Sequence, residues 1–189
     1  MTPASLEQLR WTIEDLEGFP DNGNRYEIID GELFVTRAPH IDHQNVAGRI
    51  YAALLQWSLQ SKLGEPVITP GVIFSESDAV IPDAIWISHS RRTRLIDDAG
   101  HLIGAPELIV EVLSLSEKDK KRDRVNKLKL YSQEGVYEYW IADREQESLE
   151  IYRRENGVLT KVMTLYKEDK LASPLLPGFS CEVGFLFGS

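Results

Sequence analysis

The stretch LIVEVLSLSE, residues 108–117, constrains the fold of this 189-residue chain most, because it places an acid inside an apolar run. The length of the run and its β-branched residues are typical of a strand that is buried on both faces. A glutamate is almost never fully buried unless another group pairs with it. Glu111 therefore predicts a buried strand whose middle faces a cation, a proton or a basic side chain.

The other patterns of the chain predict an α/β domain in which helices flank a central mixed sheet. Asp30-Gly31 lies between two apolar arms and is a strong hairpin signal. The expected elements are a short helix after a capping box at 12–15, a hairpin at 26–36, a helix at 42–63, strands at 66–74, 79–88 and 107–113, a helix at 119–133, and strands at 137–143, 148–154 and 158–166. We expect residues 91–106 to form a polar, mobile connection and the tail from Leu175 to add a last strand with an apolar anchor. At this length we expect one domain over residues 1–189.

The single cysteine and the hydropathy of the chain limit the class of protein. Cys181 alone can form neither an internal disulfide nor a cysteine-based zinc cluster. No apolar stretch approaches the ~20 residues of a membrane span. The first part of the chain lacks the continuous apolar core of a signal peptide. We therefore expect a soluble, cytoplasmic protein without membrane association.

The distribution of charge bears on nucleic-acid binding. The net charge of −9 argues against it, because nucleic-acid binders usually carry excess positive charge. Residues 117–129, however, hold seven Lys or Arg against three Asp or Glu, and such a basic island could meet a phosphate backbone. A solvated helix face explains the same run at least as well.

A second acid, Asp83, follows Pro82 at the start of a predicted strand. If this strand is the neighbour of the one that contains Glu111, both carboxylates can lie close together on one face. Two such carboxylates repel each other unless a cation or a proton lies between them. Mg²⁺ favours oxygen ligands and keeps several waters, so it is the expected occupant. An ordinary turn is the alternative for Pro82-Asp83.

The helix after the Glu111 strand carries basic and phenolic side chains at helical spacing, which predicts a stripe that leans over the carboxylates. These residues are Lys120, Arg124, Lys127 and Tyr131. Glu27, in the first arm of the hairpin, is a candidate third acid. His43, near the start of the long helix, is a candidate neutral donor or acid.

Each of these residues also has a structural alternative. Glu27 could pair on the surface with Arg25 or Lys62. A structural ion pair with Lys127 would make the buried Glu111 tolerable without any metal, because a buried pair is costly to break.

Together these residues resemble the Uma-two family of restriction endonuclease-like proteins, which belongs to the PD-(D/E)XK nuclease superfamily. The resemblance covers residues 10–187 and is most specific in the segment 106–140. The residues that carry it are Tyr26-Glu27, Asp30-Gly31, Pro39, His43, Pro82-Asp83, the run from Pro106 to Ser114 with Glu111, Asp123, Lys127, Tyr131, Gly135-Val136 and Glu138-Tyr139-Trp140.

The resemblance implies a restriction endonuclease-like core, with a metal site where the strands of the sheet split. It implies that Asp83 and Glu111 are metal-binding acids, that the backbone carbonyl of Val112 is a further ligand, and that Glu27 is the extra acid of the first element. It also implies cleavage of phosphodiester bonds in DNA with Mg²⁺.

One position departs from the superfamily pattern. That pattern has a lysine two residues after the acid, where this chain has Leu113. Lys127 in the next helix resembles a migrated replacement, as in the Uma-two pattern. A lysine needs only to bring its ammonium near the attacking water and the phosphate, and its long stem can do so from a neighbouring helix.

The leading hypothesis is therefore a Mg²⁺-dependent endodeoxyribonuclease, in which Mn²⁺ can substitute. In it Lys127 activates water, Glu27 assists the metal or the water, and Tyr131 positions the lysine. The basic stretch 118–129, with Lys120 and Arg124, contacts DNA phosphates.

Two other classes of function are weaker hypotheses. A catalytically inactive binding protein could keep the nuclease fold. A hydrolase that uses paired acids on sugars is the weakest, because the 4 Trp form no row of aromatic platforms. A homodimer is a further hypothesis, with the aromatic strand of Tyr137, Tyr139 and Trp140 as its interface, although these residues could equally serve a core.

Overall fold

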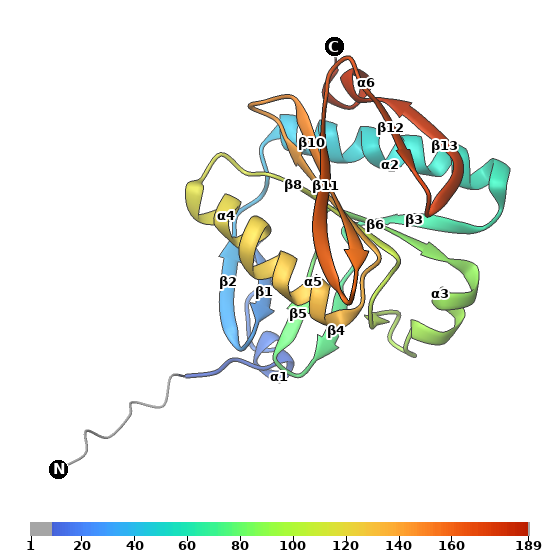
Figure 1. Ribbon diagram of the computed structural model, residues 1–189. Helices are drawn as coiled ribbons and strands as arrows, with labels where there is room; N and C mark the ends of the chain where they lie inside the picture. The colour runs from blue at the N-terminus through green and yellow to red at the C-terminus, as the bar shows by residue number, and fades with distance from the viewer. Residues whose placement is uncertain (1–8, 189) are drawn as a thin grey trace.

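Residues 9–188, which the computed structural model describes, form a mixed α/β fold with three sheets (Figure 1). The central sheet holds, in spatial order, β11 (Val158–Tyr166), β10 (Ser148–Glu155), β9 (Glu138–Asp143), β8 (Leu108–Val112), β6 (Ala84–Ser88) and β3 (Gly64–Ile68). The second sheet holds β2 (Glu32–Thr36), β1 (Arg25–Ile29), β5 (Asp78–Val80), β4 (Val72–Ser75) and β7 (Leu102–Ile103). The third sheet pairs β12 (Lys170–Ser173) with β13 (Leu176–Glu182).

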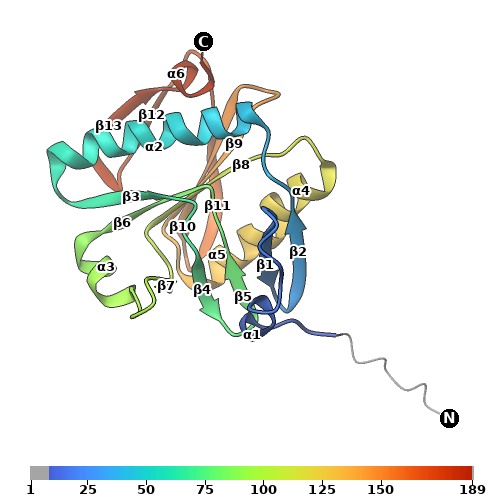
Figure 2. The ribbon, with the colours of Figure 1, turned by 180° about the vertical axis from the view of Figure 1, so that it is seen from behind.

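The helices are α1 (Ile13–Leu16), α2 (Ile41–Ser61), α3 (His89–Leu95), α4 (Glu117–Lys121), α5 (Leu128–Glu134) and α6 (Val183–Phe187), and a π-helical turn, η1 (Arg122–Lys127), joins α4 to α5. α2 and α5 cover opposite faces of the central sheet, and α1 lies beside the second sheet (Figure 2). Within the central sheet β8 runs parallel to β9 and antiparallel to β6. The predicted α/β fold, with a mixed central sheet flanked by helices, is confirmed.

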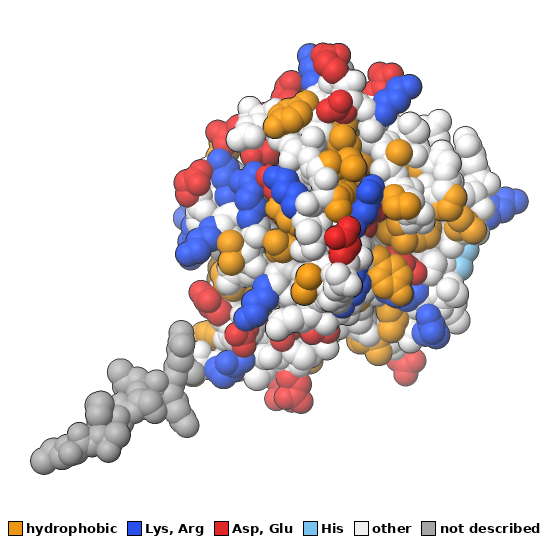
Figure 3. Space-filling view, viewed as in Figure 1, with side chains coloured by type: hydrophobic (Ala, Val, Ile, Leu, Met, Phe, Trp, Pro, Cys, Tyr) orange, Lys and Arg blue, Asp and Glu red, His pale blue; other side chains and the backbone are white. Residues whose placement is uncertain are grey.

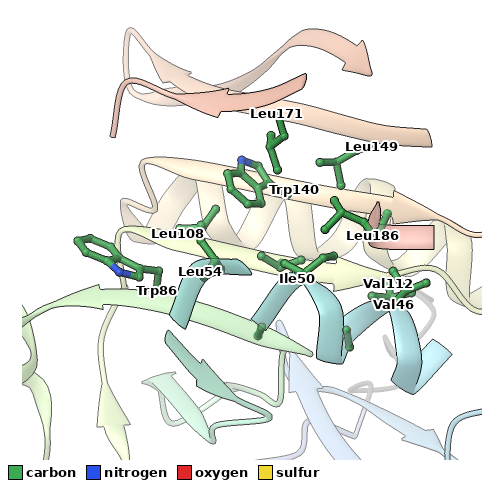
Figure 4. Close-up of a cluster of buried hydrophobic side chains, with 14 of the residues drawn as sticks. Val46, Ile50, Leu54, Trp86, Leu108, Val112, Trp140, Leu149, Leu171 and Leu186 are labelled. Carbon is green, nitrogen blue, oxygen red and sulfur yellow. The ribbon is translucent and has the colours of Figure 1, made fainter. Parts of the chain in front are cut away.

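Strand β8 lies in the middle of the molecule, and its alternating side chains enter two different cores. Leu108, Val110 and Val112 belong to the cluster under α2, where they meet Ile50 and Leu54 (Figure 4). Figure 2 shows α2 crossing this face of the sheet. The alternate side chains, those of Ile109, Glu111 and Leu113, point to the opposite face, where α5 packs. Glu111 therefore faces the helical segment that carries Lys127.

The hairpin of β1 and β2 forms where the Asp-Gly signal predicts it. Asp30 and Gly31 both have positive φ angles, of 51° and 73°. A two-residue turn with this conformation matches the twist of the strands on either side. The predicted helix over 42–63 is also confirmed, at Ile41–Ser61.

Two predicted strands are wrong because each one is divided between two sheets. The segment 66–74 becomes β3 of the central sheet and β4 of the second sheet, with Pro70 between them. The segment 79–88 becomes β5 and β6, with Pro82 between them. A proline lacks the N–H that continues a ladder, so each break falls beside one.

The segment 91–106 is also different from the prediction, because it contains most of α3 and the short strand β7. The hydroxyl of Ser88 accepts a hydrogen bond from the N–H of Arg91 at 3.3 Å and so caps α3. This serine is a signal for the start of a helix.

The aromatic strand considered as a dimer interface is β9, and it lies inside the central sheet. Tyr139 and Trp140 have no exposed surface, so this interface is wrong. Tyr137 is exposed, with the guanidinium of Arg91 4.6 Å from its ring centre. The homodimer itself stays a prediction for a size-exclusion measurement.

No helix within residues 9–188 combines the length and the apolar character that crossing a membrane requires.

Candidate active site

The candidate site lies where the chain passes from the second sheet to the central sheet. The link of residues 81–83 joins β5 to β6, and a cavity of about 40 Å³ opens beside it. The residues around this cavity are mostly charged or polar; they include Arg25, Glu27, Arg37, His43, Asp83, Glu111, Val112, Arg122, Asp123 and Lys127. A cavity of this size can hold an ion with a little water but no nucleobase.

Glu111 is buried, and two donors meet one of its oxygens. The ammonium of Lys127 lies 2.8 Å from Oε1, and the hydroxyl of Tyr131 donates to the same atom at 2.9 Å. The structural ion pair considered for Glu111 is therefore present. Tyr131 holds Glu111 and not the lysine that it was predicted to position.

Glu27 reaches the same ammonium from β1. Its Oε1 lies 2.9 Å from Nζ of Lys127 and accepts the N–H of Ile81 at 2.8 Å. The interpretation as a surface pair with Arg25 or Lys62 is wrong, because the Glu27 side chain is buried against Lys127. This contact connects the second sheet to the helical segment.

Asp83 lies beside Glu111, as predicted for neighbouring strands. The antiparallel register of β6 and β8 pairs Ala84 with Val110. Asp83, which precedes Ala84, therefore lies next to Glu111, which follows Val110. The N–H of Val112 donates to Oδ2 of Asp83 at 2.9 Å, and Nε2 of His43 lies 3.2 Å from the same oxygen.

The other oxygen of Asp83 has a different partner. Nη1 of Arg25 donates to Oδ1 at 3.0 Å. The sequence interpretation gave Arg25 no place in the site. The signal that could have found it is its spacing of two residues from Glu27 on β1, because residues two apart share one face of a strand.

The charges of the site are unevenly shared. Burial is the main cause that raises the pKa of Glu111 to about 8; Lys127 opposes this rise, and Asp83, Asp123 and Glu27 contribute to it. Burial works against the charge of Lys127, yet the surrounding acids raise its pKa above the usual value. Both shifts fit together: three acids share one lysine, so the lysine stays charged while Glu111 is under-compensated.

Asp83 has the opposite balance. Burial works against its ionisation, but the hydrogen bonds from His43 and Val112 and the charge of Arg25 hold its pKa below the usual value. The two neighbouring carboxyl groups thus have pKa values shifted in opposite directions. An added cation would relieve this crowding of acids.

The π-helical turn η1 decides which side chains of the helical segment face the site. A π-helical turn contains more residues than an α-helical turn, so side chains after it are rotated away from the expected stripe. Arg122, Asp123 and Lys127 are buried on the side of the cavity. Asp123 had no predicted role, although it lies four residues before Lys127, and its Oδ1 is 3.9 Å from Nζ.

The predicted stripe is wrong for its other two members. The ammonium of Lys120 pairs with Glu117 at 3.0 Å and with Glu145. The guanidinium of Arg124 pairs with Glu150 at 2.8 Å and with Asp143 at 3.1 Å. Neither side chain lines the cavity.

The acids suit a hydrated divalent cation better than a site made of side chains alone. Within residues 9–188, no three His, Cys, Asp or Glu side chains form a group that could hold a metal ion by themselves. Mg²⁺ usually takes one or two carboxylates and keeps several waters. Asp83 and Glu111, next to each other at a small cavity with excess acid, fit that demand.

Comparisons with known proteins agree on family and fold. A sequence model of the Uma2 family, described as "Putative restriction endonuclease", matches residues 13–184. A crystal structure from Anabaena variabilis ATCC 29413, described as "a putative nuclease belonging to DUF820", is similar over 93% of this chain and 97% of its own. The two share 16% sequence identity and superpose with a TM-score of 0.73, which shows a common fold. No curated protein matches the chain significantly.

Proposed function

The chain belongs to the Uma2 family, and from this premise we propose that it is a metal-dependent endonuclease that hydrolyses phosphodiester bonds in DNA. One observation carries the proposal. Asp83, Glu111, Glu27 and Lys127 come from four separate segments and meet at one cavity where the two large sheets join. A cluster of buried acids around one lysine costs stability, so its presence at a cavity points to chemistry.

Asp83 and Glu111, with the backbone carbonyl of Val112, would hold Mg²⁺ or Mn²⁺. When bound, the cation supplies a water of lowered pKa and polarises a phosphate oxygen. Val112 already fixes Asp83 through its N–H, at 2.9 Å, so this acid is oriented before any ligand arrives. Tyr131 fixes Glu111 in the same way, at 2.9 Å.

Lys127 is the residue that we assign to the attacking water. Its ammonium lies between Glu111 and Glu27 at the cavity, and its raised pKa keeps it charged. A fixed positive charge beside the phosphate offsets the charge that develops in the transition state. Leu113, which holds the place of the superfamily lysine, is buried in the apolar cluster on the same face. The ammonium therefore comes from the helical segment.

The outer face of this helical segment offers phosphate contacts. Lys118, Lys121 and Lys129 are exposed, and none of them pairs with an acid of residues 9–188. Figure 3 shows basic side chains gathered where Figure 1 places α4. Lys120 and Arg124 contribute less than predicted, because acidic partners neutralise them. Binding through such contacts weakens as salt rises.

The test is nicking of supercoiled plasmid DNA. We expect nicking with Mg²⁺ or Mn²⁺, none with EDTA, and a loss of at least about 100-fold in Asp83→Asn and Glu111→Gln. Lys167→Ala is the control, since it removes an exposed charge outside the cavity and outside the helical segment. Equal nicking by all variants would remove the assignment.

A second candidate is a nucleic-acid-binding protein that keeps the fold without catalysis. The observation that favours it is the direct pair of Lys127 with Glu111, at 2.8 Å, which gives this acid a basic partner without a metal. Isothermal titration with Mg²⁺ and Mn²⁺ separates the two candidates. A protein with only the ion pair takes up neither cation at this site.

A further inference from the structure

The two oxygens of Asp83 are held in different ways. Oδ2 is bound by the fold itself: the backbone N–H of Val112 donates at 2.9 Å, and His43 lies 3.2 Å away with only 7% of its side chain exposed. Oδ1 has one partner, Nη1 of Arg25 at 3.0 Å. One oxygen is therefore fixed, while the other depends on a single side chain.

Arg25 is a weakly held partner. Its side chain is 22% exposed, and Asp83 is its only hydrogen-bonded or ion-paired partner among residues 9–188. The contact uses one nitrogen, whereas the strongest arginine–carboxylate pairs use two. A partly exposed, one-point pair contributes little free energy and is easily exchanged.

Lys127 offers a contrast at the same cavity. Its side chain is 2% exposed and lies within 2.9 Å of both Glu27 and Glu111. Moving it would leave buried acids without a counter-charge, which is costly. Of the two basic groups that neutralise the acids predicted to bind metal, only Arg25 has a path to solvent and a single bond to break.

We propose that Arg25 is a replaceable counter-ion: it holds Oδ1 of Asp83 in the metal-free protein, yields this oxygen to the cation, and then binds the DNA phosphate. The proposal rests on the proposed function. A cation and a guanidinium repel each other at one carboxylate oxygen, so they compete for Asp83. A released guanidinium at the cavity presents planar donors that suit a phosphate.

Arg37 is the matched control for this inference. It lines the same cavity and is exposed, and no hydrogen bond or ion pair joins it to the described part of the chain. Replacing Arg37 removes one positive charge from the same cavity but leaves the contact between Arg25 and Oδ1 of Asp83 intact. The difference between the Arg25 and Arg37 variants therefore isolates the contact with Oδ1.

The first experiment titrates Mn²⁺ and Mg²⁺, without DNA, into the full chain and measures the heat of binding. Arg25→Met keeps the apolar stem, and Arg25→Ala is a second variant, with urea unfolding as the check that each one folds. We expect Arg25→Met to bind Mn²⁺ about three- to tenfold more tightly than the wild type, and Arg37→Met to stay within about twofold.

Three outcomes of the titration would overturn this proposal, and one of them would also overturn the proposed function. Equal or weaker binding by Arg25→Met overturns the proposal and leaves the proposed function standing, provided that the wild type binds the cation. Equal tightening by Arg25→Met and Arg37→Met also overturns it, because the effect is then general charge. No uptake by the wild type or by either Arg25 variant overturns both proposals.

The second experiment measures fluorescence anisotropy of a labelled DNA duplex with Ca²⁺ and with EDTA. Arg25→Met should weaken binding about threefold or more in Ca²⁺ and leave it unchanged in EDTA, because Arg25 is then held by Asp83. The same variant thus binds metal more tightly and DNA less tightly. If Arg25→Met weakens DNA binding equally in Ca²⁺ and in EDTA, the proposal that Arg25 exchanges Asp83 for a phosphate is overturned.

Discussion

Arg124 and Lys127 lie three residues apart on one helical segment, yet they serve two different clusters of acids. The guanidinium of Arg124 pairs with Asp143, the last residue of β9, and with Glu150, near the start of β10. The ammonium of Lys127 faces the cavity and lies 2.8 Å from Glu111. Both clusters are largely buried, so burial alone does not tell them apart.

The Arg124 cluster is balanced. Glu150 also accepts the hydroxyl of Tyr152 at 2.7 Å, and Lys161 lies 3.4 Å from it. Burial opposes the charge of Glu150, but the hydrogen bonds from Tyr152 and Arg124 lower its pKa below the usual value. Asp143 is satisfied in the same way by Arg124 and by two backbone N–H groups. Such a cluster holds strands and helix together and has no demand for a ligand.

The Lys127 cluster is unbalanced, because burial and neighbouring acids raise the pKa of Glu111 to about 8. Its members Glu27, Glu111, Asp123 and Lys127 line the cavity. Crowded acids at a cavity, more than burial, therefore mark the functional candidate. Variants of the two clusters should behave differently in catalysis, in stability and in its pH dependence.

The largest expected effect is on catalysis. Lys127→Met should lower the rate of plasmid nicking by at least about 100-fold, because it removes the positive charge beside the phosphate. Arg124→Met should leave the rate within about threefold, because its charge serves two structural acids. Both variants are compared at equal folded fraction, measured by circular dichroism. A similar loss in both would remove the distinction between the clusters.

The next effect is on stability, with different outcomes for two similar substitutions. Glu150→Gln should lower the free energy of unfolding by about 1–2 kcal/mol, because charged hydrogen bonds are lost. Glu111→Gln should change it by less than about 1 kcal/mol, because the amide keeps an acceptor for Lys127 and removes one of the crowded acids. Urea unfolding at neutral pH measures both. The comparison fails if Glu111→Gln is the more destabilising variant.

The third prediction concerns the pH dependence of stability. The ordinary pKa of Glu111 is 4.5, and in the folded protein it is about 8. Between these values the folded state keeps a proton that the unfolded state releases, so this residue makes stability fall as pH rises. Glu150 has the opposite sign: its lowered pKa makes stability fall as pH drops below about 4.5.

Urea midpoints at about pH 5 and about pH 8 check the sign for Glu111. The wild type should lose more stability between these two pH values than Glu111→Gln does. Glu150→Gln should keep the wild-type difference over this range, which makes it the control. The same slope in wild type and Glu111→Gln would contradict the raised pKa.

Local signals predicted the parts of the fold that depend on a few adjacent residues. Asp30-Gly31 forms the turn of its hairpin, and the apolar periodicity of 42–63 forms α2. The position of Glu111 inside an apolar strand predicted a buried partner for it, and Lys127 is that partner. The sequence left open whether the strands of Asp83 and Glu111 are neighbours, and the register of β6 and β8 shows that they are.

The missed helix α3 had a local signal in its capping Ser88, but the other misses arose because long-range packing overrode a local pattern. The strands over 66–74 and 79–88 are continuous in sequence but divide between two sheets. The π-helical turn rotates Lys120 and Arg124 away from Lys127, and no periodicity rule reports its position. No sequence pattern assigned Arg25, Arg122 or Asp123 a role in the site. The tertiary fold brings all three to the cavity.

A buried carboxylate without a partner is too costly in any fold, so the sequence alone shows that Glu111 needs one. Its patterns also singled out Asp83, Lys127 and Glu27, together with His43 and with Lys120 and Arg124, which do not line the cavity. How the groups share charge follows from the fold. Electrostatic interactions depend on distance and burial in space, and residues far apart in the chain set both. That is why one lysine meets three acids, and why Arg25 rests on Asp83.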